Sequence, residues 1–203
     1  MSLNRVARWD GHQWNALGGG LQDEAYTVLS LPNGDVIAGG RFQSSGNGTL
    51  LGRVGYWNGT EWLPMGEGLP GSNYYGVQSL LKTRDGSILA GCALDDADTP
   101  GIHTLMRWDG ESWTPLGELL SGSIQAMAML PDGRVVAAQN YGLDHGVSAC
   151  RCLVWDGGQW TAIGTSTTDS MIFCLLVLPG GDLVVGGLFD DIDGAPARSV
   201  ARW

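Results

Sequence analysis

A pair of tryptophans that flanks an Asp-Gly or Asn-Gly turn recurs at a nearly constant interval along this 203-residue chain. Four pairs are complete, each with its tryptophans five positions apart, and the chain ends on the first tryptophan of a fifth. The repeat units begin near Trp9, Trp57, Trp108, Trp155 and Trp203. Spacings of 48, 51, 47 and 48 residues, combined with short apolar segments, are typical of a blade array and not of a helical solenoid.

Each period contains four short extended segments, A to D. In the first period A covers residues 26–31, B covers 36–40, C covers 53–57, and D starts near Trp62. Gly-containing dipeptides between A and B, and between C and D, supply the positive φ angles of tight hairpins, so neighbouring segments run antiparallel. Such a sheet is marginal alone, but sheets packed radially bury one another's faces. We therefore predict an all-β fold: a β-propeller of four-stranded antiparallel blades, with about four repeats in a single domain over 1–203.

Two columns of the repeat indicate how the blades pack. One column of segment A holds only small residues, which places this strand innermost, where bulk would clash near the axis. That column consists of Thr27, Ser79, Ala126 and Cys174. The tryptophan pairs occupy equivalent positions next to turns in every repeat, so we interpret them as packing between blades. An aromatic platform for sugars is the alternative.

The predicted strands do not divide evenly into blades. The chain runs C-D, then A-B-C-D three times, then A-B-C, which makes 17 strands where four closed blades need 16. Residues 5–9 and 199–203 are two copies of one strand. We expect either a piece of a larger ring, cut from a longer protein, or a homodimer in which two chains complete one another.

Composition excludes several classes of function. A net charge of −10 argues against nucleic acid, because phosphate binding requires a basic face. No apolar run reaches the length of roughly 18–20 residues that a membrane-spanning helix needs. The four cysteines have no zinc-like spacing, and we interpret all four as structural thiols. The N-terminal residues lead directly into repeat sequence and resemble no signal peptide.

The repeat reads Ala-x-Trp-Asp-Gly-x-x-Trp-x-x-Leu-Gly over residues 7–18, then Leu-Pro-Asn-Gly-Asp over 31–35 and Val-Ile-Ala-Gly-Gly over 36–40. This pattern resembles bacterial and fungal kelch-like propeller repeats, often described as galactose-oxidase-like, and is similar to the fungal cortical polarity-marker family. The resemblance covers nearly the whole chain and implies secreted or surface-displayed propellers of six to eight blades. It implies no single activity, since propellers host enzymes and binding modules alike. The third repeat departs most, at residues 137–140 and 150–152.

Catalytic signatures are weak. The three histidines lie in turns and loops without a second histidine at metal-binding spacing, and the five tyrosines form no recognisable set of copper-radical ligands. Two acidic B–C loops offer oxygen ligands for a hard cation such as Ca²⁺, with solvated Asx turns as the favoured alternative. Their carboxylates are Asp95, Asp96, Asp98, Asp190, Asp191 and Asp193. We expect no catalytic residues and no cofactor, with calcium as the one weak option.

The function expected from the sequence is a non-catalytic propeller that serves as a binding or scaffold module, on a secreted or cell-surface protein. Its partner, a protein or a glycan, would contact the loops after segment B, because loops on a rigid frame carry function. Candidate ligand residues in these loops are Arg41, Gln43, His103, Asn140 and His145. The rival reading is a carbohydrate-binding or carbohydrate-active propeller enzyme at the same end. A third reading is a purely architectural spacer.

Overall fold

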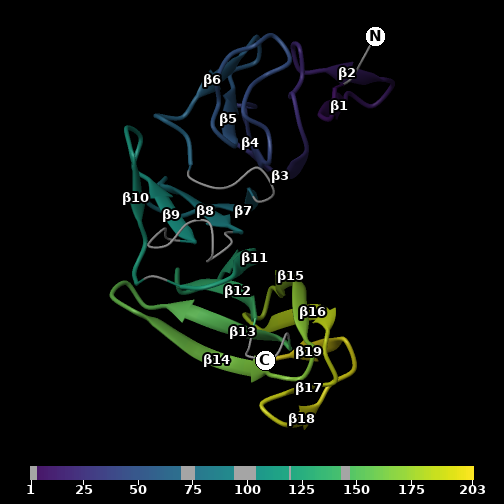
Figure 1. Cartoon of the computed structure of the whole chain (residues 1–203), viewed down its shortest axis with the longest axis vertical. Coiled ribbons are helices and arrows are strands. Elements are labelled where there is room, and N and C mark those ends of the chain that lie inside the picture. The colour runs from purple at the N-terminus through teal and green to yellow at the C-terminus, as the bar shows by residue number, and fades with distance from the viewer. Residues whose placement is uncertain (1–3, 70–75, 94–103, 119, 143–146) are drawn as a thin grey trace.

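The computed structural model describes residues 4–69, 76–93, 104–118, 120–142 and 147–203. These residues form strands, turns and loops, and no helix among them is long and apolar enough to cross a membrane. The strands assemble into three four-stranded sheets, one three-stranded sheet and two hairpins (Figure 1).

The four large sheets follow one another along the chain, each built as a meander. The first contains β3 (Ala25–Ser30), β4 (Val36–Gly40), β5 (Val54–Trp57) and β6 (Trp62–Pro64). The second contains β7 (Val77–Lys82), β8 (Ile88–Cys92), β9 (Leu105–Trp108) and β10 (Trp113–Pro115). The third contains β11 (Ser123–Met129), β12 (Val135–Gly142), β13 (Ser148–Trp155) and β14 (Trp160–Ser166). The fourth contains β15 (Met171–Val177), β16 (Leu183–Leu188) and β19 (Val200–Arg202).

Two hairpins complete the described part of the chain. The N-terminal one pairs β1 (Ala7–Trp9) with β2 (Trp14–Ala16), which are the predicted C and D segments of a unit without A and B. The other pairs β17 (Asp191–Ile192) with β18 (Ala195–Pro196) inside the last B–C loop. The 17 predicted blade strands are therefore present, and the second hairpin is an addition that the repeat pattern did not indicate.

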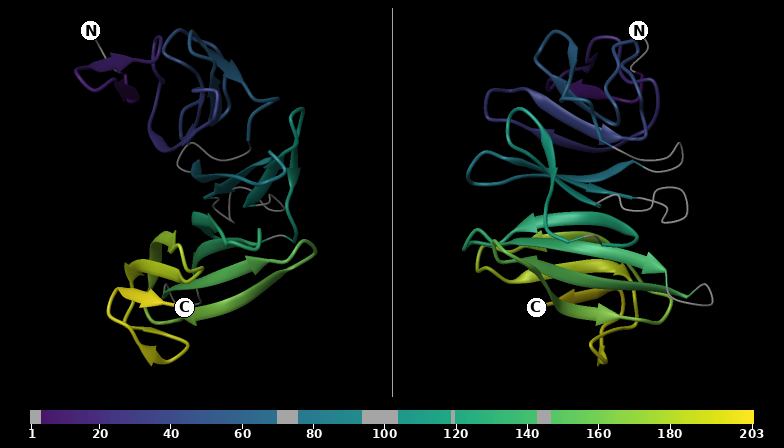
Figure 2. Two further views of the ribbon diagram at one scale, coloured as in Figure 1. Left: turned by 180° about the vertical axis from the view of Figure 1, so that it is seen from behind. Right: turned by 60° about the vertical axis from the view of Figure 1, so that its left-hand side comes forward.

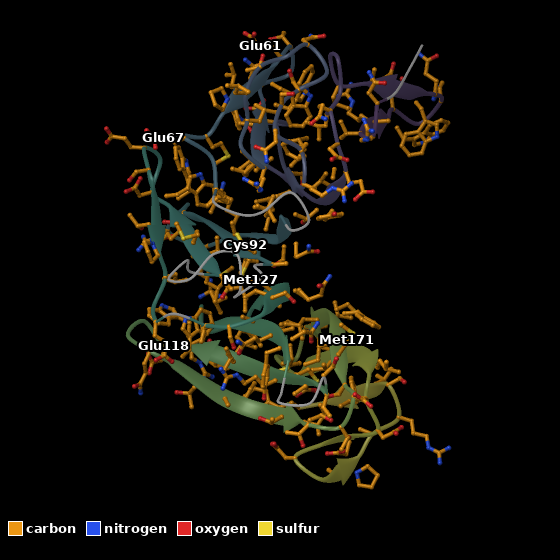
Figure 3. All side chains as sticks on the ribbon, viewed as in Figure 1. Glu61, Glu67, Cys92, Glu118, Met127 and Met171 are labelled. Atoms are coloured by element: carbon orange, nitrogen blue, oxygen red, sulfur yellow. The ribbon has the colours of Figure 1, made fainter. Side chains whose placement is uncertain are left out.

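The sheets stand around a common centre as propeller blades. The A strands β3, β7, β11 and β15 contact one another in succession, and the D strands lie outermost (Figures 1 and 2). In Figure 3, Glu67 and Glu118 lie at the outer rim, whereas Met127 and Met171 lie toward the centre. The predicted all-β propeller of four-stranded antiparallel blades is confirmed.

The tryptophan pairs join each blade to the one before it. Within a pair the ring centroids lie 5.2–5.6 Å apart with the planes tilted by 44–53°, a favourable aromatic geometry. At three blade boundaries the first tryptophan of the next blade lies against a glycine with positive φ that ends the D segment. A Cβ on that glycine would come within 2.8–3.1 Å of the indole. These glycine–tryptophan contacts join Gly18 to Trp57, Gly66 to Trp108, and Gly117 to Trp155.

The B strands form the core of each blade. Ile88–Cys92 is buried along its whole length, and most of β12 is buried as well, as expected for strands covered on both faces. The cysteines are all free thiols, and Cys92, Cys150 and Cys152 lie in this core. Cys174 is exposed, because it lies on β15, an innermost strand whose side chains face the open centre of the sheets.

Candidate functional site

The predicted ligand residues of the B–C loops that the structure describes bond to neighbouring groups of the protein. Arg41 bonds to Asp23, with Nε 3.2 Å from a carboxylate oxygen, and the backbone carbonyl of Gln43 accepts two loop N–H groups. Asn140 is buried, and its amide bridges the backbone N–H and C=O of Ile172 across the next sheet at 2.8 and 2.9 Å. His103 and His145 lie outside the described residues.

Of the two predicted acidic loops, the structure describes the one that contains Asp190, Asp191 and Asp193. Asp95, Asp96 and Asp98 lie outside the described residues. In the last loop, Asp191 accepts the N–H of Gly194 at 3.0 Å and Asp193 accepts the N–H of Thr165 at 2.9 Å. Asp190 uses its backbone carbonyl to bond Ala197. In the part of the chain that the structure describes, no three His, Cys, Asp or Glu side chains are grouped so as to hold a metal ion.

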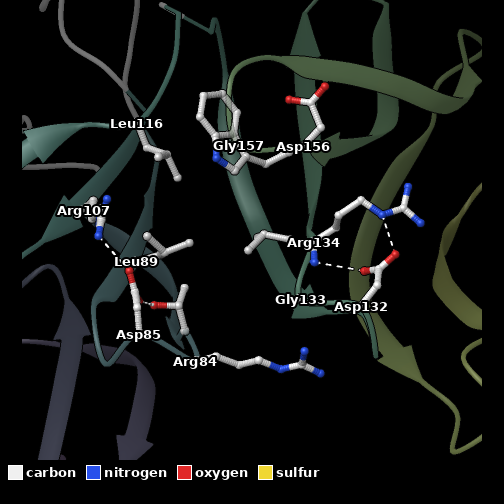
Figure 4. A pocket seen from close by; sticks show the side chains of 13 residues that line it. Arg84, Asp85, Leu89, Arg107, Leu116, Asp132, Gly133, Arg134, Asp156 and Gly157 are labelled. Carbon is white, nitrogen blue, oxygen red and sulfur yellow. Dashed lines mark hydrogen bonds and ion pairs between the residues drawn. The ribbon is translucent and has the colours of Figure 1, made fainter.

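A polar groove of about 410 Å³ opens between the second and third blades, at the end of the sheets that carries the A–B and C–D turns (Figure 4). Three arginines line it: Arg84 from the turn after β7, Arg107 from β9, and Arg134 beside the turn before β12. The indole of Trp155 lines it as well. Arg84 reaches across the blade boundary and donates to the carbonyl of Pro131. The groove therefore lies at the end opposite the predicted B–C loops.

Three carboxylates accompany the arginines. Arg107 Nη2 lies 2.8 Å from Asp85, and Arg134 Nε lies 2.6 Å from Asp132 (Figure 4). Asp156 accepts two backbone N–H groups of its own turn through one oxygen. The groove thus presents donors and acceptors side by side, with no net charge among these six groups.

The carboxylates of the groove are stabilised in their ionised form. The hydroxyl of Thr83 is the main cause that lowers the pKa of Asp85. The backbone N–H of Arg134 lowers the pKa of Asp132, and backbone N–H groups lower the pKa of Asp156. A hydrogen bond donated to a carboxylate favours the charged form. These groups are therefore suited to accepting hydrogen bonds near neutral pH and not to donating a proton.

The same groove recurs at other blade boundaries, but without this charge pattern. Between the first and second blades it has about 360 Å³, and between β1–β2 and the first blade about 100 Å³. Each copy is lined by the first tryptophan of the following blade, Trp57, Trp108 or Trp155. The groove is a consequence of the repeat, so its individual chemistry comes from residues that depart from the repeat.

Two arginines of the groove are such departures. Arg84 stands where the other repeats have Pro32, Pro131 and Pro179. Arg134 follows the turn glycine where the other repeats have Asp35, Ser87 and Asp182. Both positions lie in the short A–B turns and not in the long B–C loops where ligand residues were expected. Their departure from the repeat is visible in the sequence when the A–B turns of the four repeats are aligned.

No protein-family model matches this sequence, and a search of curated proteins finds no relative. Several solved structures are similar in fold. The extracellular domain of a B. thetaiotaomicron protein, described as a one-component system, matches all of this chain at 15% identity with a TM-score of 0.63. This chain spans 25% of that domain.

Two further structures give the same picture. A Dyadobacter fermentans protein of unknown function aligns with 88% of this chain and 65% of its own at 17% identity, TM-score 0.55. The protein YCF48, solved with a D1 peptide bound, aligns with 98% of this chain and 58% of its own at 19% identity, TM-score 0.55. At these identities the likeness concerns the fold alone.

Proposed function

We propose that this chain is a non-catalytic propeller module that binds a neutral, polyhydroxylated ligand, an oligosaccharide, in the groove between the second and third blades. The observation that carries the proposal is that guanidinium and carboxylate groups, two of them paired as Arg107–Asp85 and Arg134–Asp132, line the same groove as Trp155. Paired donors and acceptors suit vicinal hydroxyl groups, each of which donates and accepts. An indole adds apolar area for the face of a sugar ring.

Charge favours a neutral ligand over an acidic one. The six charged groups named above cancel within the groove, whereas the whole chain carries −10. A polyanion would therefore be repelled at long range and would find no net positive field locally. The ionised carboxylates support binding over general acid catalysis, because an acid catalyst needs a raised pKa.

The setting that we propose is a secreted or cell-surface protein. The resemblance of the repeats to kelch-like propellers supports it, as does the extracellular domain among the structures of similar fold. A peptide-bound propeller of similar fold makes a protein ligand the main competitor of the glycan.

The test is binding to an array of neutral and acidic oligosaccharides, followed by calorimetry with the best neutral ligand. Replacing Arg84 with Pro and Arg134 with Ser restores the residues of other repeats, and we expect it to weaken binding at least about tenfold while the fold is retained. Arg198→Ala, an exposed arginine away from the groove, is the matched control and leaves affinity unchanged. A silent array with peptide binding would favour the protein ligand, product formation would favour the enzyme, and no ligand at all would favour a spacer.

A further inference from the structure

Each complete blade is fastened to the preceding unit by its second tryptophan. The indole N–H donates to a backbone carbonyl that lies three residues after the second tryptophan of that preceding unit. These bonds join Trp62 to Leu17 at 3.0 Å, Trp113 to Met65 at 3.1 Å and Trp160 to Leu116 at 3.1 Å. The next carbonyl in the series is that of Ile163, and no indole among the described residues donates to it.

A cavity of about 520 Å³ lies at this place, between the third and fourth blades. Its lining is largely apolar and includes Ile163 from β14, Leu183 and Val185 from β16, and Trp203. The described part of the fourth sheet ends at β19, which has no neighbour on its outer edge. A Cβ on Gly164 would lie 2.8 Å from Ile192 of the β17 hairpin, whereas the matching glycines of the earlier units pack on the first tryptophan of the next blade. Ile163, Leu183 and Trp203 occupy the repeat positions of Leu116, Val135 and Trp155, so the cavity is the copy of the blade-boundary groove beside the Ile163 carbonyl.

The N-terminal hairpin contains a second tryptophan of the kind that would bond the Ile163 carbonyl. Trp9 and Trp14 form a pair with the geometry of the other three, with centroids 5.6 Å apart, yet they are 50% and 60% exposed. The indole N–H of Trp14 has no acceptor in the part of the chain that the structure describes. The hairpin already receives the Trp62 bond on Leu17, as a blade would. The hairpin therefore has the C–D arrangement of a blade and is bonded to the first blade.

β1 of the hairpin and β19 of the fourth sheet share one sequence. Residues 6–9 and 200–203 both read Val-Ala-Arg-Trp. β19 pairs with β16 over only three residues, with Ala201 opposite Val185 and an ion pair between Arg202 and Asp182. Ala7 and Arg8 can reproduce these contacts, so an exchange of β19 for β1 loses little and adds β2 and its tryptophan.

We infer that the β1–β2 hairpin of a second copy of this chain completes the fourth blade. It lies beside β16 in place of β19, and Trp14 enters the cavity with its N–H on the Ile163 carbonyl. Exposed strand edges accept a strand from another chain in this way. Repeated by a two-fold axis, the contact closes a ring from two copies and leaves each β19 displaced. This inference is independent of the proposed ligand.

Cross-linking identifies the occupant. In a Cys174→Ala background, Ala7→Cys and Val185→Cys in one chain place the two thiols opposite each other across the exchanged strands. The expected product after mild oxidation is a disulfide-linked dimer, absent from chains that carry only one of the two introduced cysteines. A disulfide within a monomer, which means that the chain closes on itself, overturns the inference, and so does the absence of any disulfide.

Sedimentation of the unmodified chain is an independent test. We expect a dimer, and we expect Trp14→Ala to lower its association constant by at least roughly thirtyfold, the effect of losing a central tryptophan anchor. Leu50→Ala, at a residue that is 77% exposed, is the control that leaves association unchanged. A strictly monomeric chain, or an unaffected dimer of the Trp14 variant with an unaltered circular dichroism spectrum, contradicts the inference.

Discussion

Replacing Trp160 with Ala should remove much of the stabilising contact between the second and third blades. The side chain is 8% exposed, packs on Trp155 with centroids 5.2 Å apart, and donates to Leu116 of the preceding blade at 3.1 Å. A buried indole contributes about 150–250 Å² of contact area, which at about 25 cal/mol/Å² corresponds to roughly 4–6 kcal/mol as an upper bound. Measured Trp→Ala losses of about 3–5 kcal/mol agree with this range. We expect the free energy of unfolding to fall by about 4 kcal/mol.

Denaturant unfolding followed by circular dichroism measures this loss. Trp160→Phe keeps a ring but removes the N–H donor, so we expect a smaller loss of about 1–2 kcal/mol. Leu50→Ala serves as the exposed control and should stay within about 0.5 kcal/mol of the parent chain. If Trp160→Ala and the control had the same stability, the role of the tryptophan pairs as the fastening between blades would be refuted.

Three further predictions concern polar and reactive groups. Asn140→Ala should cost about 2–3 kcal/mol in the free energy of unfolding, because its buried amide satisfies both backbone groups of Ile172; Asn140→Asp should be no better in the same denaturant assay. The lowered pKa values of Asp85 and Asp132 stabilise the fold fully above about pH 4 and progressively less as the pH falls through those lowered values; replacing both with Asn should flatten the acid limb of stability against pH. Only the exposed Cys174 should react rapidly with a thiol reagent in the native chain at pH 8, and all four cysteines should react after denaturation, as counted by mass spectrometry.

The thiol prediction rests on burial. Desolvation raises the pKa of Cys92 and of Cys152 to about 12, so their thiolates are scarce near neutral pH and their sulfurs are inaccessible as well. Rapid native modification of either would mean that its blade opens far more readily than the packed core implies.

The sequence alone determined the architecture, because the repeat encodes it locally. The Asp-Gly and Asn-Gly turns favour hairpins. The first tryptophan of a pair, at the end of a C segment, packs against a glycine of the preceding unit at three blade boundaries. The strand surplus was also visible, since residues 5–9 and 199–203 are copies of one strand. These features act within one period of the chain, so counting and spacing were sufficient to find them.

Only the tertiary structure decided which charged side chains lie together in a groove. Arg84 and Arg107 belong to the second blade and Arg134 to the third, so the three line one groove only because these two blades pack side by side. The same packing left Cys174 exposed while it buried the other three cysteines. The local sequence pattern determines the strands and turns of each sheet. The surface between two sheets depends instead on which residues the radial packing brings together.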